Sequence, residues 1–408
     1  MTRWDTDPWS LGSYSALPAG TSSDARATIA DAVLGDGLVF AGEHASTTHP
    51  ATVQGAYLSG RHAAALLLRE YGDIDGDTVA VIGAGVAGLA AAGRLQRAGA
   101  AVTVLEGRDR IGGRVHTDIS WGVPVELGAA WIHGVRDNPI TPLVLQGGST
   151  LMMTDYDDEL VHDHAGGQAR GVTGAQGRVE RAIGRMESQA FPLATSVQQV
   201  LESSGVRPTI TDRWAVETAI TQEYGVSPRT LGAAALYEGG AQVGGDALVR
   251  GGYAVVPRRL AEGIAVRLRT PVRSVEARAS GGFAIALRSG ERLAADAVVV
   301  AVPLSILQRR VIAIAPMPSN VRRAVDRLEM GSLEKVILQY PERWWPAAQV
   351  LGVVGGTARR WAEWYDLTSL LGVPSVVGFS AAAAAAARPR TDGACIAEAS
   401  AVFRRAFG

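Results

Sequence analysis

The sequence is poor in cysteine, in excess charge of either sign and in long hydrophobic runs. Its one cysteine, Cys395, excludes an internal disulfide framework and any cysteine-based metal site, so we expect no bound metal. A net charge of −1 gives no basic field for nucleic acid. No apolar run reaches about 18 residues, and the first residues lack the charged-then-apolar pattern of a signal peptide. We therefore expect a cytoplasmic protein that binds neither nucleic acid nor membrane.

Glycine, in contrast, is abundant, and one group of glycines follows a strand-like run. Thr78 to Ile82 is apolar and β-branched after its first residue, as in a parallel strand buried on both faces. Next comes G-x-G-x-x-G, where the strand must turn into a helix: the glycines are Gly83, Gly85 and Gly88, and the helix opens with Val86 and Ala87. The first glycine permits a tight turn, the second lets backbone approach a pyrophosphate, and the third lets helix and strand pack closely. The helix N-terminus then faces the phosphates.

A carboxylate follows at the distance that such a site requires. Ala101 to Leu105 reads as the second strand, and Glu106 ends it, where an acid accepts the ribose hydroxyls of an adenine dinucleotide. Arg108 and Arg110 leave open a 2′-phosphate, and hence NADP. Against NADP, residues 112–114 read GGR, and a second glycine pair with an arginine suits another approach to a pyrophosphate. The order of strand, turn, helix, strand and acid predicts a dinucleotide-binding domain.

These residues resemble the FAD-binding start of the flavin amine oxidases, the family of the monoamine and polyamine oxidases and the lysine-specific histone demethylases. The similarity continues through residues 125–134, which read VELGAAWIHG. The resemblance implies an α/β fold, with a Rossmann-type FAD-binding domain of the glutathione-reductase-like kind and an inserted α+β substrate-binding domain. It also implies FAD as cofactor, near Gly107, Arg108, Gly113, Arg114, Gly128, Ala129, Ala130, Trp131 and Val272.

Residues 1–68 stand in an unexpected place. Leu38 to Ala41 reads as a buried strand closed by Gly42 and Glu43, and Thr52 to Leu68 reads as a helix. By itself this is an ordinary α/β fragment, but it resembles the segment that flavin amine oxidases carry at their C-terminal end. The last residues of this chain, 395–408, resemble the helix that precedes that segment. The sequence therefore predicts a circular permutation, joined through the polar stretch 69–77.

The resemblance also predicts where the domains begin and end. Residues 1–134 are the expected FAD-binding domain, with 1–68 as the displaced segment and 69–77 as the linker. Residues 135–245 are the first, mainly helical part of the substrate domain, in which the glycine-rich stretch 165–177 predicts a mobile loop. Residues 246–312 return to the FAD-binding domain, 313–390 form the second part of the substrate domain, and 391–408 form a helix of the FAD-binding domain.

Lys335 is the expected catalytic residue. Residues 331–335 read GSLEK, ahead of an alternating strand over 335–340, and the family places its active-site lysine in such a step. From the strand alone, a surface lysine on an edge strand is the alternative. The resemblance implies instead that Lys335 holds a water beside the flavin.

The resemblance supplies the walls of the site as well. Tyr14 matches an aromatic residue that faces the flavin, whereas the opposite wall falls at Thr52, which is not aromatic and suggests a roomier site. Trp131 and His133 are expected in the substrate pocket, and for His133 a structural imidazole is an equal alternative. Further FAD contacts are expected from Gly42, Glu43, Thr52 and Val53. Ser13 stands where some relatives carry the cysteine that bonds to the flavin, so FAD should be held non-covalently.

The implied reaction is FAD-dependent oxidation of an amine to an imine, which water hydrolyses to an aldehyde or ketone. Dioxygen would reoxidise the flavin and give hydrogen peroxide. The expected partners are a small-molecule amine and dioxygen, and a homodimer stays open. One alternative is an L-amino-acid oxidase, which needs an arginine for the substrate carboxylate, with Arg359 and Arg360 as candidates. Another is a catalytically silent FAD-binding protein.

Overall fold

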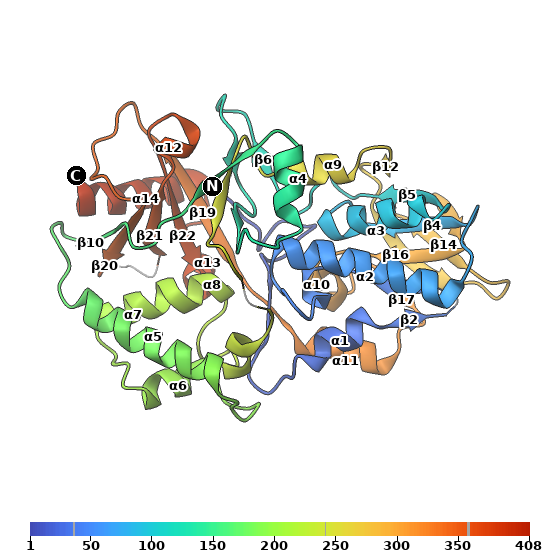
Figure 1. Ribbon diagram of the computed structural model, residues 1–408, viewed down its shortest axis with the longest axis horizontal. Coiled ribbons are helices and arrows are strands. Elements are labelled where there is room, and N and C mark those ends of the chain that lie inside the picture. The colour runs from blue at the N-terminus through green and yellow to red at the C-terminus, as the bar shows by residue number, and fades with distance from the viewer. Residues whose placement is uncertain (36, 241, 357–359) are drawn as a thin grey trace.

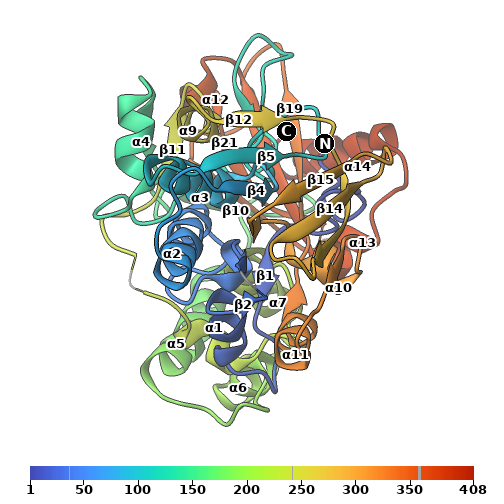
Figure 2. The same cartoon turned by 90° about the vertical axis from the view of Figure 1, so that its right-hand side faces the viewer.

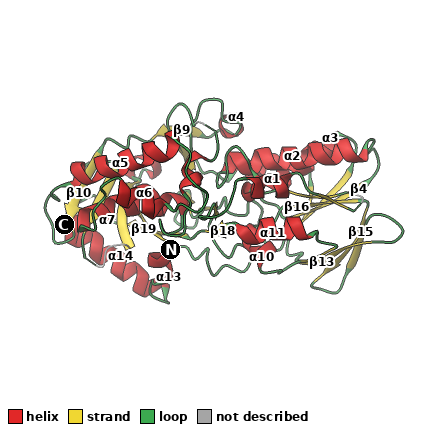
Figure 3. Cartoon of the chain, turned by 90° about the horizontal axis from the view of Figure 1, so that it is seen from below, coloured by secondary structure: helices red, strands yellow, loops and turns green. Residues whose placement is uncertain are grey.

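The computed structural model describes residues 1–35, 37–240, 242–356 and 360–408, and forms two lobes (Figure 1). One lobe is built on a six-stranded sheet and the other on a five-stranded sheet, and we call them the six-strand lobe and the five-strand lobe. Figure 2 looks onto the six-strand lobe, and Figure 3 shows both lobes from below.

The six-stranded sheet has the order β12-β5-β4-β16-β3-β2, and only its edge strand β2 is antiparallel to its neighbour. Its strands are β12 (Ala265–Arg267), β5 (Ala101–Leu105), β4 (Thr78–Ile82), β16 (Ala297–Val300), β3 (Leu38–Phe40) and β2 (Val33–Leu34). The central strands are apolar and buried on both faces, as parallel sheets require. Strand β3 comes from the segment 1–68, so that segment is part of this sheet.

Two helices from distant parts of the sequence cover this sheet side by side. They are α2 (Val53–Tyr71) and α3 (Val86–Arg97), both visible along the top of Figure 3. They approach closely because α2 carries Gly60, where a Cβ would stand 2.0 Å from the Ala87 carbonyl oxygen. The segment 1–68 is therefore packed against the glycine-turn helix as well as paired in the sheet.

A four-stranded sheet, β15-β14-β13-β17, completes this lobe together with helices α1, α10 and α11. Its elements are β13 (Val272–Ala277), β14 (Phe283–Leu287), β15 (Arg292–Ala295), β17 (Ala313–Ala315), α1 (Asp24–Ala30), α10 (Leu304–Gln308) and α11 (Ser319–Arg327). Strand β17 pairs with β13, and α11 packs against α1. These elements extend the six-strand lobe to about residue 327, beyond the expected change of domain at residue 313.

The five-strand lobe is a mixed sheet, β10-β20-β21-β22-β19, with helices on both sides (Figure 1). Its strands are β10 (Glu159–Asp163), β20 (Val350–Val354), β21 (Arg360–Asp366), β22 (Ser375–Ala381) and β19 (Leu333–Gln339). Its helices are α5 (Val172–Ser188), α6 (Val197–Ser203), α7 (Ile210–Val216), the π-helix η2 (Glu217–Thr221), α8 (Gln222–Tyr224), the 3-10 helix η3 (Ala233–Tyr237), α12 (Thr368–Leu371) and α13 (Ala382–Ala386). The expected loop over 165–177 is wrong at its end, because α5 begins at Val172 and buries Ala175, Val179 and Ala182 on one face.

Short elements lie between the lobes. They are β1 (Ser15–Ala16) paired with β18 (Glu329–Met330), β6 (Thr117–Asp118) paired with β7 (Val125–Glu126), the sheet β8-β11-β9 (Trp131–Ile132, Ala247–Arg250, Thr150–Met153), α4 (Ile140–Gln146), α9 (Val255–Leu260) and the 3-10 helix η1 (Glu43–Ala45).

Both ends of the chain lie on the five-strand lobe. The last helix, α14 (Asp392–Phe407), packs against β19, β21 and β10 through Phe403 and Phe407, and Met1 packs against the same apolar cluster. Residues 391–408 are a helix, as expected, but the assignment of this helix to the FAD-binding domain is wrong, since its apolar face fits the five-stranded sheet. The nearness of the two ends is what a permuted chain requires.

In the part of the chain that the structure describes, no helix is long and apolar enough to cross a bilayer.

Candidate active site

The turn between β4 and α3 has the geometry that its glycines predict. Gly83 has φ +107°, and a Cβ there would stand 2.7 Å from the Ala301 carbonyl oxygen. At Gly85, nothing lies within 4 Å of the Cβ position, so this backbone borders open space. A Cβ at Gly88 would stand 2.0 Å from the Gly83 carbonyl oxygen, so only glycine lets α3 pack this closely on the turn.

Glu106 lies beside this turn at the end of β5. Its Oε2 accepts a hydrogen bond from the Ala84 N–H at 2.7 Å, and its Oε1 accepts one from the Arg108 N–H at 2.8 Å. The Arg108 guanidinium donates to both carboxylate oxygens of Asp7 at 2.7 Å. Arg108 therefore fastens the N-terminal segment to the turn, which makes it a poor candidate for a 2′-phosphate.

The turn opens into a cavity of about 1000 Å³ between the two lobes. Every site residue expected from the sequence lines this cavity except Gly88, which lies behind the turn. The lining residues among them are Gly42, Glu43, Val53, Gly83, Gly85, Val86, Ala87, Glu106, Gly107, Arg108, Gly113, Arg114, Gly128, Ala129, Ala130 and Val272, together with Tyr14, Thr52, Trp131, His133 and Lys335.

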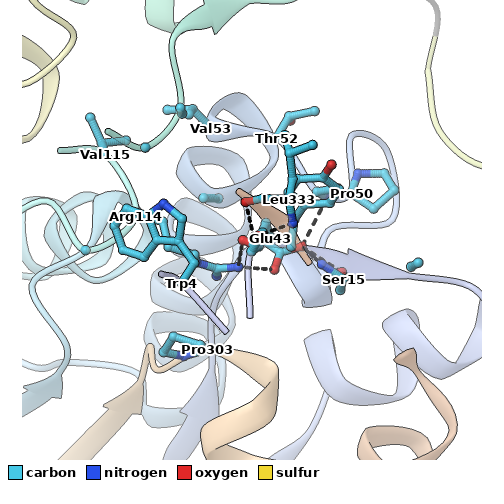
Figure 4. Close-up of a pocket in the computed structure, with 18 of the residues that line it drawn as sticks. Trp4, Ser15, Glu43, Pro50, Thr52, Val53, Arg114, Val115, Pro303 and Leu333 are labelled. Atoms are coloured by element: carbon cyan, nitrogen blue, oxygen red, sulfur yellow. Dashed lines mark hydrogen bonds and ion pairs between the residues drawn. The ribbon is translucent and has the colours of Figure 1, made fainter. Parts of the chain in front are cut away.

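Glu43 and Arg114 meet in this cavity although 71 positions separate them (Figure 4). Arg114 Nη1 donates to Glu43 Oε1 at 2.8 Å and to the Ser13 carbonyl oxygen at 2.8 Å. Glu43 Oε2 accepts from the Ser15 hydroxyl at 2.6 Å and from the Ala51 N–H at 3.1 Å. Burial alone would raise the pKa of Glu43, but chiefly the charge of Arg114 holds that pKa at about 2. Both side chains are thus engaged within the protein at the place where cofactor contacts were expected.

A second ion pair ties the segment 1–68 to the loop that follows η3. Arg26 Nε lies 2.7 Å from Glu238 Oε1, and its Nη1 donates to the Ser15 hydroxyl oxygen at 2.7 Å. The side chains of Arg26 and Glu238 are 1% and 5% exposed, so the pair is buried. Through Ser15 the pair connects to Glu43 and Arg114, and the four charges form one network around the cavity.

Tyr14 and Thr52 line the cavity with their hydroxyl groups already occupied. The Tyr14 hydroxyl donates to the Gln222 carbonyl oxygen at 2.5 Å, and burial raises the pKa of Tyr14. The Thr52 hydroxyl caps α2 by accepting from the Gly55 N–H at 2.9 Å, and it donates to the His49 carbonyl oxygen. Thr52 therefore caps helix α2.

Lys335 lies on β19 with its side chain buried at the cavity wall. Its Nζ donates to the carbonyl oxygens of Gly128 and, at 3.5 Å, Glu126. The amine lies 5.9 Å from the centre of the Trp131 ring and 5.8 Å from that of Phe379. Burial lowers the pKa of Lys335 to about 8, against an opposing effect of the Glu126 charge. Lys335 is only 6% exposed, so the alternative of a surface lysine on an edge strand does not hold.

Three aromatic rings next to Lys335 form a wall that the sequence did not reveal as a group. The centre of the Trp131 ring lies 5.0 Å from that of Tyr365 and 6.1 Å from that of Phe379. These residues come from β8, β21 and β22, and all three line the cavity. Such a wall presents an apolar, electron-rich surface to an amine.

His133 also lines the cavity and has an acidic partner. Its Nδ1 lies 2.8 Å from Asp246 Oδ2, which also accepts from the Tyr156 hydroxyl at 3.0 Å. Burial opposes protonation of the imidazole, but the hydrogen bond with Asp246 raises the pKa of His133. The hydrogen bond with Asp246 therefore fixes the orientation of the imidazole.

Part of the cavity lining carries carboxylates that sequence reasoning missed, and we call it the acidic part of the cavity. Its acids are Asp157, Glu159, Glu180, Glu223 and Glu363, of which Glu159 and Glu363 are half-buried and the other three are exposed. Burial and the nearby charges of Glu159 and Glu223 raise the pKa of Glu363 to about 8. Among the described residues, none of these acids has an arginine or lysine ion-pair partner. An acid among the aromatic residues of β21 was the available signal for Glu363.

The nucleotide end of the cavity fits FAD. The open space at Gly85, the helix N-terminus behind it and Glu106 beside it match the needs of a pyrophosphate and a ribose. The volume matches that of large ligand sites. Arg110, whose Nη1 donates to the Gly113 carbonyl oxygen, supplies a positive charge near the second glycine pair.

Comparison with known proteins agrees with this fit. A sequence profile described as "Flavin containing amine oxidoreductase" matches residues 1–68 and 86–408. Polyamine oxidase 2 of Arabidopsis thaliana is 33% identical over 328 residues, which cover 74% of this chain and 66% of the relative. Lysine-specific histone demethylase 2 of Homo sapiens is 30% identical over 72% of this chain and 39% of the relative. The chain thus spans about two thirds of the polyamine oxidase and a smaller part of the demethylase.

Solved structures of putrescine oxidase variants share the fold. One superimposes with a TM-score of 0.66 at 24% identity and covers 81% of each chain. Another superimposes with a TM-score of 0.62 at 25% identity and covers 77% of each chain. The profile match extends over nearly the whole sequence, on both sides of the linker. The chain belongs to the flavin-containing amine oxidoreductase family, and its cofactor is FAD.

Proposed function

We propose that the protein oxidises a primary amine group of a substrate that carries a second ammonium group, a diamine or polyamine. The single observation that carries this proposal is the group of carboxylates in the acidic part of the cavity, none of which has an arginine or lysine partner among the described residues. A buried carboxylate is costly unless a cation or a proton accompanies it. An ammonium group of the substrate supplies that cation.

The aromatic wall and the acids together support one orientation of a bound diamine. Lys335 and the aromatic wall of Trp131, Tyr365 and Phe379 line the same cavity as the acids, and Glu363 lies two residues from Tyr365 on the same strand. A reacting amine beside the wall would leave its other end near Glu363, Glu159 and Glu223. The polyamine and putrescine oxidases to which this chain is similar are named for substrates of this class.

The reacting amine must be neutral, since an ammonium nitrogen has no lone pair to assist loss of hydrogen from the neighbouring carbon. The aromatic wall favours the neutral form by desolvation. FAD, when bound, accepts the two electrons and the hydrogen. The residues of this chain orient the amine, exclude water and, at Lys335 Nζ, hold a proton beside the reaction.

We further propose that dioxygen is the electron acceptor, that hydrogen peroxide is released, and that FAD is held without a covalent bond. Ser13 supports the last point, because its hydroxyl is hydrogen-bonded to the Leu333 backbone and a hydroxyl forms no thioether. The circular permutation belongs to the same proposal. The two-part profile match, the pairing of β3 with β16 and the nearness of the chain ends support it.

The amino-acid oxidase alternative finds less support. Among the described residues, three arginines line the cavity, Arg26, Arg108 and Arg114. Each of them forms an ion pair with a carboxylate. Arg360 pairs with Glu398 at 2.6 Å, and Arg359 lies outside the described residues. A substrate carboxylate in the acidic part of the cavity would be repelled.

The test is a substrate panel with the purified, FAD-loaded protein. Linear diamines, monoamines of equal length and L-amino acids are mixed anaerobically, and bleaching of the flavin near 450 nm is followed before air is admitted and peroxide measured. Diamines should bleach the flavin fastest. Faster bleaching by amino acids would support the alternative, and a flavin that no compound bleaches would support a catalytically silent FAD-binding protein.

A further inference from the structure

Lys335 lies on an edge strand, and residues from the start of the sequence cover that edge. Strand β19 stands at the end of the five-stranded sheet and pairs with β22 on one side. Backbone groups on the outer side of an edge strand need partners from elsewhere. Ser13 supplies them at Leu333, where its hydroxyl bonds both the N–H and the carbonyl oxygen, and Thr2 supplies them at Lys335.

Thr2 forms two hydrogen bonds with the backbone of Lys335. The Thr2 N–H donates to the Lys335 carbonyl oxygen at 2.9 Å, and the Lys335 N–H donates to the Thr2 hydroxyl oxygen at 2.8 Å. The same hydroxyl donates to Glu334 Oε2 at 2.7 Å. All three residues are buried, so the loss of one bond would leave a polar group without a partner.

A second residue of the same segment holds the backbone that the Lys335 amine meets. The buried Trp4 donates its indole N–H to the Leu127 carbonyl oxygen at 2.9 Å. Leu127 stands between Glu126 and Gly128, whose carbonyl oxygens accept from Lys335 Nζ. Residues 2 and 4 therefore hold both the strand from which the lysine side chain starts and the backbone at which its amine ends.

Further contacts anchor this segment behind the cavity wall. The Arg388 guanidinium donates to both carboxylate oxygens of Asp5 at 2.8 and 2.5 Å, and the Asp5 N–H donates to Glu334 Oε1 at 3.0 Å. Thr2, Asp5 and Glu334 are not lining residues of the cavity. These groups can therefore act on the site only through the residues that they hold.

We propose that Thr2 is a positioning residue of the active site, which together with Trp4 sets where the Lys335 amine lies in the cavity wall. A segment that holds both ends of one side chain fixes the distance between them, and a displacement of about 1 Å can lower a rate by about 100-fold. The inference rests on the proposed role of Lys335. Its main test needs no turnover, so it can fail while amine oxidation stands.

Lys335 is the only lysine in the sequence, which makes a direct test possible. Biosynthetic incorporation of lysine labelled with ¹³C at Cε gives one methylene signal in the FAD-loaded protein. The neighbouring amine lies 5.9 Å from the centre of the Trp131 ring and 5.8 Å from that of Phe379. Because aromatic rings shift the resonances of nearby nuclei, the ¹H and ¹³C shifts of this methylene report the position of the side chain.

The variants separate positioning from general stability. Thr2→Val keeps the shape of the side chain but removes the hydroxyl, whereas Thr2→Ser keeps the hydroxyl. Asp5→Asn weakens the ion pair with Arg388 but leaves both hydrogen bonds between Thr2 and Lys335, and Thr6→Val makes the same change as Thr2→Val at an exposed position. The flavin spectrum and thermal unfolding confirm that each variant is folded and loaded.

We expect the methylene signal to move by more than its linewidth in Thr2→Val and to stay in place in Thr2→Ser, Asp5→Asn and Thr6→Val. If Thr2→Val does not fold, Trp4→Phe, which removes the hydrogen bond to Leu127 but keeps an aromatic ring, should move the signal instead. An unmoved signal in the folded variant would overturn the proposal, as would an equal shift in Thr2→Ser or in either control.

With a substrate that reduces the flavin, Thr2→Val should lower kcat by about tenfold and leave KM within about twofold, because the groups that line the cavity are unchanged. Thr2→Ser should restore the wild-type kcat. A wild-type kcat in Thr2→Val would also overturn the proposal.

Discussion

The nucleotide end and the acidic part of the cavity differ in how their charged side chains are paired. At the nucleotide end, the backbone of the glycine turn lines the cavity, and the charged side chains Arg114, Glu43 and Arg108 are paired with one another or with Asp7. In the acidic part of the cavity, and among the described residues, Glu363 and the other acids have no arginine or lysine partner and the Gln222 amide has no hydrogen-bond partner. The charges at the nucleotide end are paired within the protein, whereas the acidic part offers carboxyl groups with which a substrate ammonium group can pair.

The largest effect on the rate should come from replacing Lys335. Replacing Lys335 by methionine removes the only lysine of the sequence, and we expect the rate of flavin reduction or of reoxidation by dioxygen to fall by about 100-fold or more. Lys335→Arg should lower these rates by a similar factor, because arginine does not release its proton. Stopped-flow absorbance with and without air measures the two rates separately. Wild-type rates in Lys335→Arg would show that the site uses only a fixed charge.

In the acidic part of the cavity, Glu363→Gln keeps the shape of the side chain but removes the carboxyl group that can give up its proton when an ammonium group binds. A charge-assisted hydrogen bond contributes about 1.5–3 kcal/mol, so kcat/KM for a diamine should fall by about 10- to 100-fold. A monoamine of equal length, which does not reach Glu363, is the internal control. Equal losses for both substrates would place the second ammonium group elsewhere.

At the nucleotide end, two glycines of one turn should respond differently. Gly85→Ala adds a methyl group to open space, so the apoprotein should keep its stability while the Kd for FAD rises about tenfold by a clash with the cofactor. Gly83→Ala places a side chain at positive φ, 2.7 Å from a carbonyl oxygen, and should cost about 1–2 kcal/mol of folding free energy or more. Thermal unfolding of the apoproteins and FAD titration separate the two effects. The reverse pattern would contradict the assigned roles.

The smallest effect concerns stability and pH. The pKa of Glu363 is about 8 in the folded, ligand-free protein and near 4.5 when unfolded, so the folded state binds more protons between these values. The free energy of unfolding should therefore fall as pH rises from 4.5 to 8. Glu363→Gln removes this dependence and should melt about 2 °C or more above the wild type at pH 9 but close to it at pH 5. Parallel pH curves for the two proteins would exclude a buried proton on Glu363.

The sequence predicts the nucleotide end well because its geometry depends on local patterns. The bounds of β4, α3 and β5 follow from the apolar runs and the glycines, and Glu106 lies where strand length puts it. The aromatic wall is harder to predict, because Trp131, Tyr365 and Phe379 come from three strands that are brought together only by tertiary pairing. Helix α5 was missed at its start because Gly174 and Gly177 weaken the helical pattern that burial sustains. The contacts of α14 and β17 with their sheets also depend on tertiary packing, so local sequence patterns did not predict them.

The packing of strand β3 between β16 and β2 has a consequence for how the protein is held together. Residues 1–71 join the rest through sheet hydrogen bonds, the α2–α3 contact and the pairs Arg26–Glu238 and Glu43–Arg114. A single proteolytic cut in the stretch 72–77 should thus leave two fragments that stay associated and keep their yellow colour. Produced separately, the two fragments should reassemble around FAD as a split enzyme.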